Sequence, residues 1–476
     1  MSRRKRRPPI VLEELAITGI ADRGSVVGRS PTGEVAFARG PVPGDVVDVS
    51  VRKKKGVFQE GRATRWHRFA EERTVPFCEH FGACGGCSYQ HLAYPAQLAA
   101  KDRLVRDAYE RLGGLEADAL LEPILGAPAD RAYRNKMEYA FAERRWLTEE
   151  EMALGHRQEG AALGFHRRGA WDKVLDVRRC HLQRVAGDDL RNALRAVALE
   201  QGLTFYDERR HRGLLRKAML RALDAGEVML VLMLGERDDE AVARYLAAVR
   251  AACPRVTSAY TVVNEKANDS MTGLAPELAF GPPHVTERLG HVDFRIGPLS
   301  FFQTNTAQAV RLYDVVAEYA GLDGTQTVYD LYAGVGSIGL YLARGARSVV
   351  AIEEVAPAIA DAEANAALNG IANFTGYAGD VADVLTEAFA DAHGAPDVVV
   401  TDPPRAGMHA DVVAMLLTLA APRIVYVSCN PATQARDLRL LRDGGYRVAR
   451  ARAVDMFPQT PHCEAVAVLE RERPSV

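Results

Sequence analysis

The chain has 476 residues, more than one ordinary hydrophobic core holds, which predicts two or three domains. Hydrophobic residues make up 48% of it, and 60 Lys and Arg nearly balance 62 Asp and Glu, a composition typical of a globular protein. No apolar run approaches the roughly 20 residues that cross a bilayer, so we expect no membrane partner.

The basic residues are unevenly distributed along the chain. Residues 1–68 hold 15 Lys and Arg against 7 Asp and Glu, although the formal net charge of the whole chain is −2. A basic module on an acidic body favours a phosphate-bearing partner. A disordered basic tail beside a solvated loop explains the charge equally well.

The N-terminus and the seven cysteines indicate the compartment. The opening residues, MSRRKRRPPI, lead into no apolar segment and do not form a secretory signal. An odd number of unevenly spaced cysteines does not suggest a disulfide framework, and metal ligands or catalytic thiols are the better interpretation. We therefore expect a cytoplasmic protein.

Residues 11–68 are predicted to form a small all-β unit. Short β-rich stretches at Leu15–Ile20, Glu34–Ala38 and Val46–Val51 are separated by Gly and Pro turns. This spacing fits an OB-like barrel, a common scaffold for single-stranded nucleic acid. The basic run Arg52–Lys55 is expected on a loop beside the barrel.

A cysteine cluster and a helix follow the barrel. Cys78, Cys84 and Cys87 have spacings that suit metal ligands, and thiolates hold zinc or an iron–sulfur cluster. Apolar residues at helical spacing predict a helix over Pro95–Leu112, which a Gly-Gly pair ends. From residue 133 to about residue 285, β-rich stretches alternate with a few helices, which indicates an α+β region.

From about Gln326 the pattern becomes regular. Apolar strands alternate with helical stretches, and the predicted strands are Thr327–Leu331, Ser348–Ile352, Asp397–Thr401 and Ile424–Val427. This alternation predicts a doubly wound parallel sheet, and therefore a Rossmann-like α/β domain at the C-terminus.

A glycine-rich stretch, DLYAGVGSIGL, follows the first of these strands and opens a helix. Gly334 and Gly336 allow a tight turn and a close approach of the backbone to a ligand. Glu353 ends the next strand, where its carboxylate can accept hydrogen bonds from two ribose hydroxyls. NAD enzymes and methyltransferases share this pattern, and Gly339 also satisfies the NAD spacing.

The third predicted strand runs into Asp402-Pro403-Pro404-Arg405. Its prolines fix an extended turn at the edge of the sheet where such folds bind ligands. The turn resembles the fourth motif of class I S-adenosylmethionine methyltransferases. Members that methylate exocyclic amines usually have an aromatic residue after the two prolines, so Arg405 argues against amino methylation.

Cys429 ends the fourth strand, at the edge where active sites form, and its thiolate is a candidate nucleophile. A lone cysteine is more often a packing residue. Its surroundings change this interpretation, because YVSCNPATQARDL and DMFPQTPHCEAVAVLER are similar to the uridine-5 RNA methyltransferase family, which includes bacterial ribosomal and transfer-RNA enzymes.

The resemblance covers nearly the whole chain. Glu34–Asp45 is similar to the TRAM domain, an RNA-binding barrel, and Leu163–Cys180 and Phe301–Asn305 match further family segments. It implies three domains. These are a basic tail and TRAM-like barrel (1–68), a central iron–sulfur and RNA-binding domain (69–298), whose helix at about 93–114 packs on the catalytic domain, and an S-adenosylmethionine-dependent methyltransferase domain (299–476).

The resemblance also implies roles for individual residues. The contacts with S-adenosylmethionine or the target base are expected from Gln303, Tyr332, Ser337, Glu353 and Asp402, with Asp380 near the adenine. The catalytic residues are expected to be Cys429, Glu464 and Asp402. A 4Fe-4S cluster is expected on Cys78, Cys84, Cys87 and Cys180, although cysteine spacing alone favours zinc. Ala333 and Ser337 depart from the Cys and Asn that are frequent in the family.

The chemistry explains why these residue types are needed. Carbon 5 of uracil is a poor nucleophile until the Cys429 thiolate adds to carbon 6 and pushes electron density onto carbon 5. After methyl transfer, the Glu464 carboxylate removes the hydrogen from carbon 5 as general base, and Asp402 holds the uracil edge. A stacked base cannot react this way, so the uridine must be flipped or single-stranded.

The expected partner is RNA, most specifically 23S ribosomal RNA, with transfer RNA as the alternative. Candidate RNA contacts are Arg52, Arg134, Lys136, Arg167, Arg168 and Arg405, which support binding as a set. We expect a monomer. Two other functions stay open. One is a cytosine-5 DNA methyltransferase, although Ser428-Cys429-Asn430 of this chain does not match the motif around the nucleophile of those enzymes. The other is an inactive RNA-binding scaffold.

Overall fold

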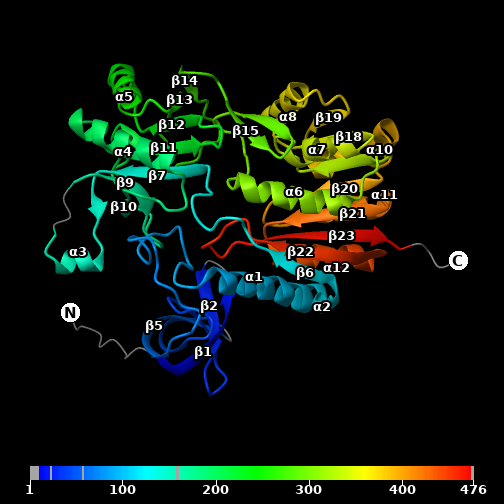
Figure 1. Ribbon diagram of the computed structural model, residues 1–476, viewed down its shortest axis with the longest axis horizontal. Coiled ribbons are helices and arrows are strands. Elements are labelled where there is room, and N and C mark those ends of the chain that lie inside the picture. Colours follow the sequence, from blue (N-terminus) through cyan, green and yellow to red (C-terminus); the bar gives the residue numbers. More distant parts are fainter. Residues whose placement is uncertain (1–9, 22–23, 56–57, 157–159, 473–476) are drawn as a thin grey trace, which may run out of the picture.

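The computed structural model describes residues 10–21, 24–55, 58–156 and 160–472, which form three regions in chain order (Figure 1). The first is a closed barrel with the strand order β1-β2-β3-β5-β4. Its strands are β1 (Val11–Ala21), β2 (Ser25–Arg29), β3 (Val35–Arg39), β4 (Val46–Lys55) and β5 (Phe58–Arg68). The predicted OB-like barrel is confirmed. The sequence pattern had not revealed β2 and β5.

The second region is an α+β unit. Its mixed eight-stranded sheet has the order β14-β13-β12-β11-β7-β9-β10-β8. The strands are β7 (Lys136–Ala142), β8 (Arg145–Trp146), β9 (Ala162–His166), β10 (Val174–Asp176), β11 (Leu215–Ala222), β12 (Val228–Leu234), β13 (Val256–Val263) and β14 (Glu277–Phe280). The helices are α3 (Glu149–Ala153), α4 (Val185–Glu200) and α5 (Asp239–Ala252), and the apolar faces of α4 and α5 share one core with the sheet.

The third region contains the predicted doubly wound sheet. Its strand order is β19-β18-β17-β20-β21-β23-β22-β6, with β17 to β21 parallel and β23 antiparallel to both its neighbours. The strands are β17 (Thr327–Leu331), β18 (Ser348–Glu353), β19 (Phe374–Ala378), β20 (Val398–Thr401), β21 (Arg423–Ser428), β22 (Tyr446–Val454) and β23 (Glu464–Arg471). This order, with its reversal between β17 and β20, is Rossmann-like and confirms the prediction.

Helices cover both faces of this sheet. One hydrophobic core lies under α6 (Thr306–Ala320), α7 (Ser337–Leu342), the short turn η3 (Ala343–Gly345) and α8 (Ala356–Leu368). A second core lies under α11 (Ala410–Leu419) and α12 (Pro431–Asp443), with α9 (Val381–Val384) and α10 (Glu387–His393) beside them. Among the described residues, no helix is long and apolar enough to cross a membrane.

Two segments that precede residue 299 in the chain pack on this third region. β6 (Leu121–Leu125) pairs with β22 at the edge of the sheet. The hairpin of β15 (Val285–Leu289) and β16 (Val292–Ile296) shares a core with α6, and its backbone N–H groups donate to Asn365 and Asn369 at the end of α8. The expected boundary at 298/299 falls between this hairpin and α6.

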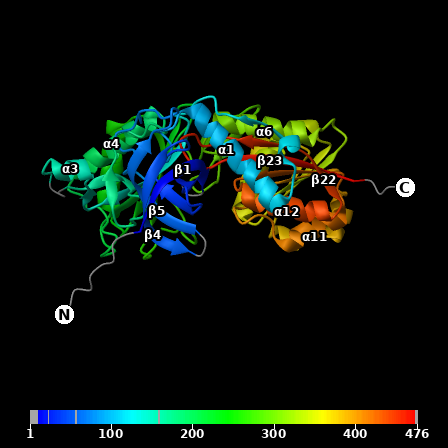
Figure 2. The same ribbon diagram turned by 90° about the horizontal axis from the view of Figure 1, so that it is seen from below.

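The helix predicted after the cysteine cluster connects the regions. α1 (Tyr94–Ala108) continues as a π turn, η2 (Tyr109–Gly113), and α2 (Ala117–Leu120) leads into β6. Figure 2 shows α1 running alongside α12. The buried Tyr109 hydroxyl donates to Gln434 Oε1 of α12 at 2.8 Å. The segment between barrel and central sheet is thereby fixed to the C-terminal sheet.

Candidate active site

The eight residues that the sequence places at the cofactor and the reacting base all line one cavity of about 1930 Å³. They are Gln303, Tyr332, Ser337, Glu353, Asp380, Asp402, Cys429 and Glu464. Parallel strands bring five of them to one edge, because each follows or ends a strand at its carboxyl end. Glu464 reaches the same edge because it begins β23, which is antiparallel to β21.

The glycine turn after β17 shapes one half of the cavity. Tyr332, Gly334 and Gly336 have φ angles of 62°, 56° and 73°, the left-handed region that favours glycine. A Cβ on Gly336 would lie 2.9 Å from Cβ of Ala362, so a side chain does not fit there. Gly334 lines the cavity itself, and nothing lies within 4 Å of where its Cβ would be, so at this residue the backbone borders the open cavity.

Glu353 is held rigidly beside this turn. Its two carboxylate oxygens accept hydrogen bonds from the backbone N–H groups of Gly334 and Val355, both at 2.9 Å. Each oxygen keeps a further lone pair for a ligand hydroxyl. Asp380 is exposed at the start of α9 and accepts from the N–H of Ala382 at 2.8 Å. Ser337 Oγ lies 2.8 Å from the buried Tyr313 hydroxyl.

The charges around the cavity separate the two cofactors that share such a glycine turn. The side with the glycine turn carries carboxyls, from Asp330, Glu353 and Asp380. Three arginines among the described residues also line the cavity, and they lie away from the glycine turn. Arg134 is next to Phe457, Arg405 next to His462 and Arg436 next to Asp437. The pyrophosphate of NAD would be poorly stabilised among these carboxyls. The sulfonium and amino groups of S-adenosylmethionine are cationic, so the carboxyls favour S-adenosylmethionine.

Asp402, Cys429 and Glu464 meet in the other half. Glu464 is 6% exposed, and its burial raises its pKa to about 8, with Asp402 acting in the same direction and Arg405 against it. Burial raises the pKa of Asp402 to about 7. Burial, followed by the nearby carboxyls of Glu464 and Asp402, raises the pKa of the Cys429 thiol to about 11, and Arg405 opposes this. Two acceptors that titrate near neutrality therefore lie beside a protonated thiol.

Arg405 is the cation of this half, and the sequence suggested it only as an RNA contact. Its backbone carbonyl accepts from Asn430 Nδ2 at 2.9 Å, which fixes the turn after β20 to the residue following Cys429. Its Nη2 lies 3.0 Å from Nδ1 of His462. The guanidinium can therefore stabilise a thiolate on Cys429, a role that its place after two prolines did not reveal.

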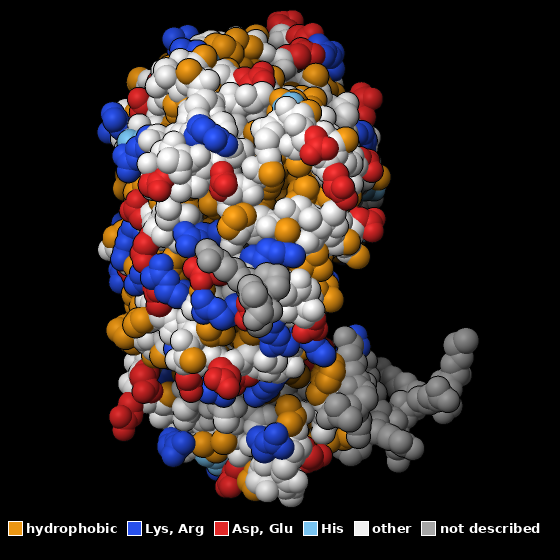
Figure 3. Space-filling view, turned by 90° about the vertical axis from the view of Figure 1, so that its right-hand side faces the viewer, with side chains coloured by type: hydrophobic (Ala, Val, Ile, Leu, Met, Phe, Trp, Pro, Cys, Tyr) orange, Lys and Arg blue, Asp and Glu red, His pale blue; other side chains and the backbone are white. Residues whose placement is uncertain are grey.

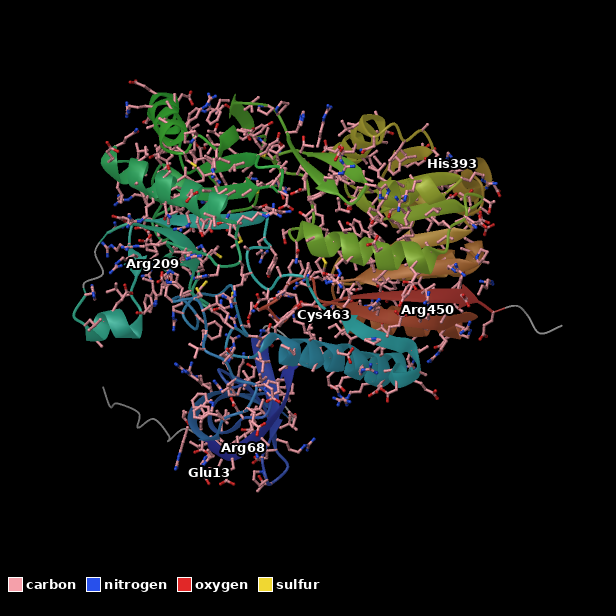
Figure 4. All side chains as sticks on the ribbon, viewed as in Figure 1. Glu13, Arg68, Arg209, His393, Arg450 and Cys463 are labelled. Carbon is pink, nitrogen blue, oxygen red and sulfur yellow. The ribbon has the colours of Figure 1, made fainter. Side chains whose placement is uncertain are left out.

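The four predicted metal ligands surround a second cavity, of about 310 Å³. Its walls include all four thiols, together with Arg134, Lys136 and Arg179. Burial raises the pKa of each thiol, and the Cys78, Cys84 and Cys180 thiols raise that of Cys87 further, to about 12. Among the described residues, no three Cys, His, Asp or Glu side chains are close enough to hold one metal ion. Cys253 and Cys463 are buried and do not line this cavity; Cys463 is labelled in Figure 4.

A third hollow, of about 1400 Å³, runs between the barrel and the cysteine segment. Its walls contain two acidic residues, Glu60 and Glu79. The basic residues are more numerous, and they are Arg39, Arg52, Lys53, Arg62, Arg167 and Arg168. Aromatic rings lie among them, at Phe37, Phe58, Phe81 and Trp146. One groove thus contains three of the candidate RNA contacts that the sequence suggested, namely Arg52, Arg167 and Arg168. The end of the molecule formed by the third region instead shows basic and acidic side chains interspersed (Figure 3).

Comparisons with known proteins agree with this site. Residues 284–472 match the family model described as tRNA (uracil-5-)-methyltransferase. A protein of Bacteroides thetaiotaomicron, described as an uncharacterized RNA methyltransferase, is 44% identical over 92% of this chain and 96% of its own length. A Porphyromonas gingivalis protein with the same description is also 44% identical, over 96% and 99%.

The fold as a whole has a solved counterpart. The structure of the Pyrococcus abyssi tRNA (uracil-54, C5)-methyltransferase, in complex with S-adenosyl-L-homocysteine, superimposes with a TM-score of 0.73. The two chains are 28% identical, and the match covers 96% of this chain and all of that one. With the glycine turn, the Asp402 turn and the relatives taken together, the chain belongs to the family of S-adenosylmethionine-dependent RNA uracil-5-methyltransferases.

Proposed function

We propose that the protein methylates carbon 5 of a uridine in RNA through a covalent bond between Cys429 and the uracil. The observation that carries this proposal is the meeting of Cys429, Glu464 and Asp402 in the cavity that also contains the glycine turn. A thiol, a buried carboxyl with a pKa near 8 and a second carboxyl are the groups that such a reaction needs.

The reaction begins when the Cys429 thiol loses its proton to a neighbouring carboxylate and its sulfur adds to carbon 6. The electrons of the C5–C6 double bond then move toward the carbonyl at carbon 4 as an enolate, which Asp402 stabilises by a hydrogen bond to the uracil edge. S-adenosylmethionine, when bound, would supply an electrophilic methyl group to carbon 5, and the electron pair of the broken sulfur–methyl bond would stay on its sulfur. The Glu464 carboxylate next takes the hydrogen of carbon 5 as a proton, the C–H electron pair restores the double bond, and the C6–S bond breaks with its pair returning to sulfur.

The groove beside the barrel supports a single-stranded RNA substrate. Guanidinium groups bind phosphates, and partly exposed rings that line the groove, such as Phe58, can stack on bases regardless of sequence. Cys84 and Cys87 line both this groove and the cysteine cavity, and Arg134 lines both the cysteine cavity and the catalytic cavity. The cysteine cavity therefore lies between the groove and the catalytic cavity.

We propose 23S ribosomal RNA as the substrate, with transfer RNA as the second candidate. The TRAM-like barrel and the cysteine cluster support the first candidate, because the transfer-RNA branch of the family generally lacks them. The Pyrococcus abyssi neighbour supports the second, because it is named as a tRNA enzyme and matches over the barrel as well. Labelled S-adenosylmethionine, the purified protein and either RNA decide between them. Nucleoside digestion should give labelled 5-methyluridine from 23S RNA, and label in transfer RNA alone would assign the other substrate. No label in either would refute the activity.

We further propose that Cys78, Cys84, Cys87 and Cys180 hold a 4Fe-4S cluster. The cavity that they surround is far larger than one metal ion, and a cubane cluster keeps its four thiolates farther apart than one ion does. The cationic Arg134, Lys136 and Arg179 in the same walls offset the negative charge of four thiolates. The proposed methylation transfers no electrons, so the cluster would order this segment and the RNA beside it.

A further inference from the structure

We propose that Gln459 is a positioning residue that fixes the loop before Glu464 to helix α1 and to the cysteine segment, and so sets the removal of the carbon 5 proton. The inference rests on the proposed role of Glu464 as general base. Gln459 does not touch the reacting base in this account, and it acts only through the loop at residues 455–462.

The first observation is the set of bonds to the backbone of Gln459. Its carbonyl accepts hydrogen bonds from the N–H groups of Ser88 at 2.8 Å and Tyr89 at 3.2 Å. These two residues directly follow Cys87. The cysteine segment is therefore bound to the catalytic loop at a point five residues before Glu464.

The second observation is a pair of buried glutamines. Gln97 of α1 and Gln459 are 1% and 2% exposed. Gln97 Nε2 donates to Gln459 Oε1 at 2.9 Å, and the N–H of Gln459 donates to Gln97 Oε1 at 3.0 Å. Gln459 Nε2 also donates to Asp130 Oδ2 at 3.1 Å. Every polar group of Gln459 is thus used to hold the loop to preceding segments of the chain.

The third observation is the backbone of Gln459 itself, which has φ at 69°. A residue other than glycine keeps this conformation only where its surroundings enforce it. Such residues concentrate at functional sites. The enforcing bonds here are the ones to Gln97, Asp130, Ser88 and Tyr89.

A buried ion pair fixes the start of the same loop. Lys101 of α1 and Asp455 are both fully buried, with Nζ 2.6 Å from Oδ1. Lys101 also donates to the carbonyl of Phe457 at 3.1 Å, and the Tyr133 hydroxyl donates to the carbonyl of Pro458 at 2.9 Å. At the other end, the N–H of His462 donates to Thr460 Oγ1 at 3.3 Å. The loop is therefore held by residues from outside the C-terminal sheet between positions 455 and 459, and its last turn is closed by a bond within the loop.

The consequence for the reaction falls on one step. Glu464 must lie within hydrogen-bond reach of the carbon 5 hydrogen, whereas Cys429 is positioned by β21 and α12 and meets this loop only through the contact of Arg405 with His462. Loosening the loop at Gln459 should therefore slow proton removal much more than thiolate addition and methyl transfer. Loss of the carbon 5 proton and release of Cys429 should become slow, and methylated RNA should remain bonded to the protein.

Three variants of the full-length protein test this inference, each incubated with RNA and S-adenosylmethionine. Gln459→Gly keeps the backbone conformation and removes the side-chain bonds. Gln97→Ala removes both bonds of the pair from the other side, together with the Nε2 bonds to the carbonyls of Tyr89 and Leu92. Asp130→Ala removes one bond from a half-buried residue and so preserves folding. Tyr245→Phe is the control, because it deletes a buried 2.8 Å bond to Leu194 in the central region.

The readout is the decay of the methylated adduct on a denaturing gel, beside the Kd for S-adenosylmethionine. Gln459→Gly and Gln97→Ala should slow the decay by on the order of 10²-fold, with an unchanged Kd, and the double variant should slow it by less than the product of the two single effects, because the two residues share one pair of bonds. Asp130→Ala should slow it less, and Tyr245→Phe not at all. Wild-type decay in Gln459→Gly and Asp130→Ala, while Glu464→Gln traps the adduct, would overturn this inference alone. If Glu464→Gln traps nothing, the proposed role of Glu464 fails first.

Discussion

Replacing Glu464 with Gln should change how stability depends on pH. An ordinary glutamate titrates near pH 4.3, whereas burial and Asp402 raise the pKa of Glu464 to about 8. Between these values the folded protein binds a proton that the unfolded chain releases. The contribution of this one carboxyl to stability is therefore fullest below about pH 4 and is lost as the pH rises from there through 8.

The size of the effect follows from the same two values. At about 1.4 kcal/mol for each tenfold change in proton affinity, the buried carboxylate costs at most about 5 kcal/mol above pH 8. One kcal/mol moves the melting midpoint of a domain of this size by about 2–4 °C. Half of the full cost, about 2.5 kcal/mol, therefore corresponds to a shift of roughly 5–10 °C. Glu464→Gln should remove this cost, because an amide does not ionise.

Thermal melts at pH 5 and pH 9 measure the loss of stability that ionisation of Glu464 causes. Wild type should lose stability between these pH values by several degrees more than Glu464→Gln does, and any packing cost of the amide cancels in the comparison. Glu110→Gln, an exposed carboxyl on η2, is the matched control and should behave as wild type. Equal losses for wild type and Glu464→Gln would refute the claim that this carboxyl is held in a raised titration range.

Three further predictions concern the cofactor, the cysteines and the RNA. Gly336→Ala should raise the Kd for S-adenosylmethionine about tenfold by calorimetry, because its Cβ meets Ala362 at 2.9 Å in a left-handed turn, and an unchanged Kd would contradict this. Cys84→Ser should abolish the visible absorbance of protein purified without oxygen and lower its Tm, whereas stoichiometric zinc without acid-labile sulfide in the wild type would exclude the cluster. Deleting residues 1–68 should weaken RNA binding and flatten its salt dependence, and an unchanged slope would assign binding to the central region.

Much of the catalytic sheet could be predicted from the sequence because its signals are local. Thr327–Leu331 is identical in prediction and structure, and β18 differs by one residue. Buried parallel strands are continuous apolar runs, and the turns after them carry their own chemistry, at Asp402 and Cys429. The barrel strand β5 was missed because charged residues, such as Glu60, Arg62 and Arg65, interrupt its apolar pattern.

The contacts that hold the site together could not be predicted, because they join residues far apart in the chain. Lys101 and Asp455 are 354 positions apart, and Gln97 and Gln459 are 362 apart. Nothing in either neighbourhood identifies its partner. The same reason hid the pairing of β6 with β22, since a short strand contains no information about which sheet edge it joins.

The central claim is a covalent bond from Cys429 to uracil that Glu464 later resolves. The most direct measurement is a denaturing gel of the protein incubated with labelled S-adenosylmethionine and RNA. Glu464→Gln should give a slow, labelled protein–RNA band, and Cys429→Ala should give neither this band nor 5-methyluridine, because the first bond never forms. Labelled 5-methyluridine from Cys429→Ala would contradict the account.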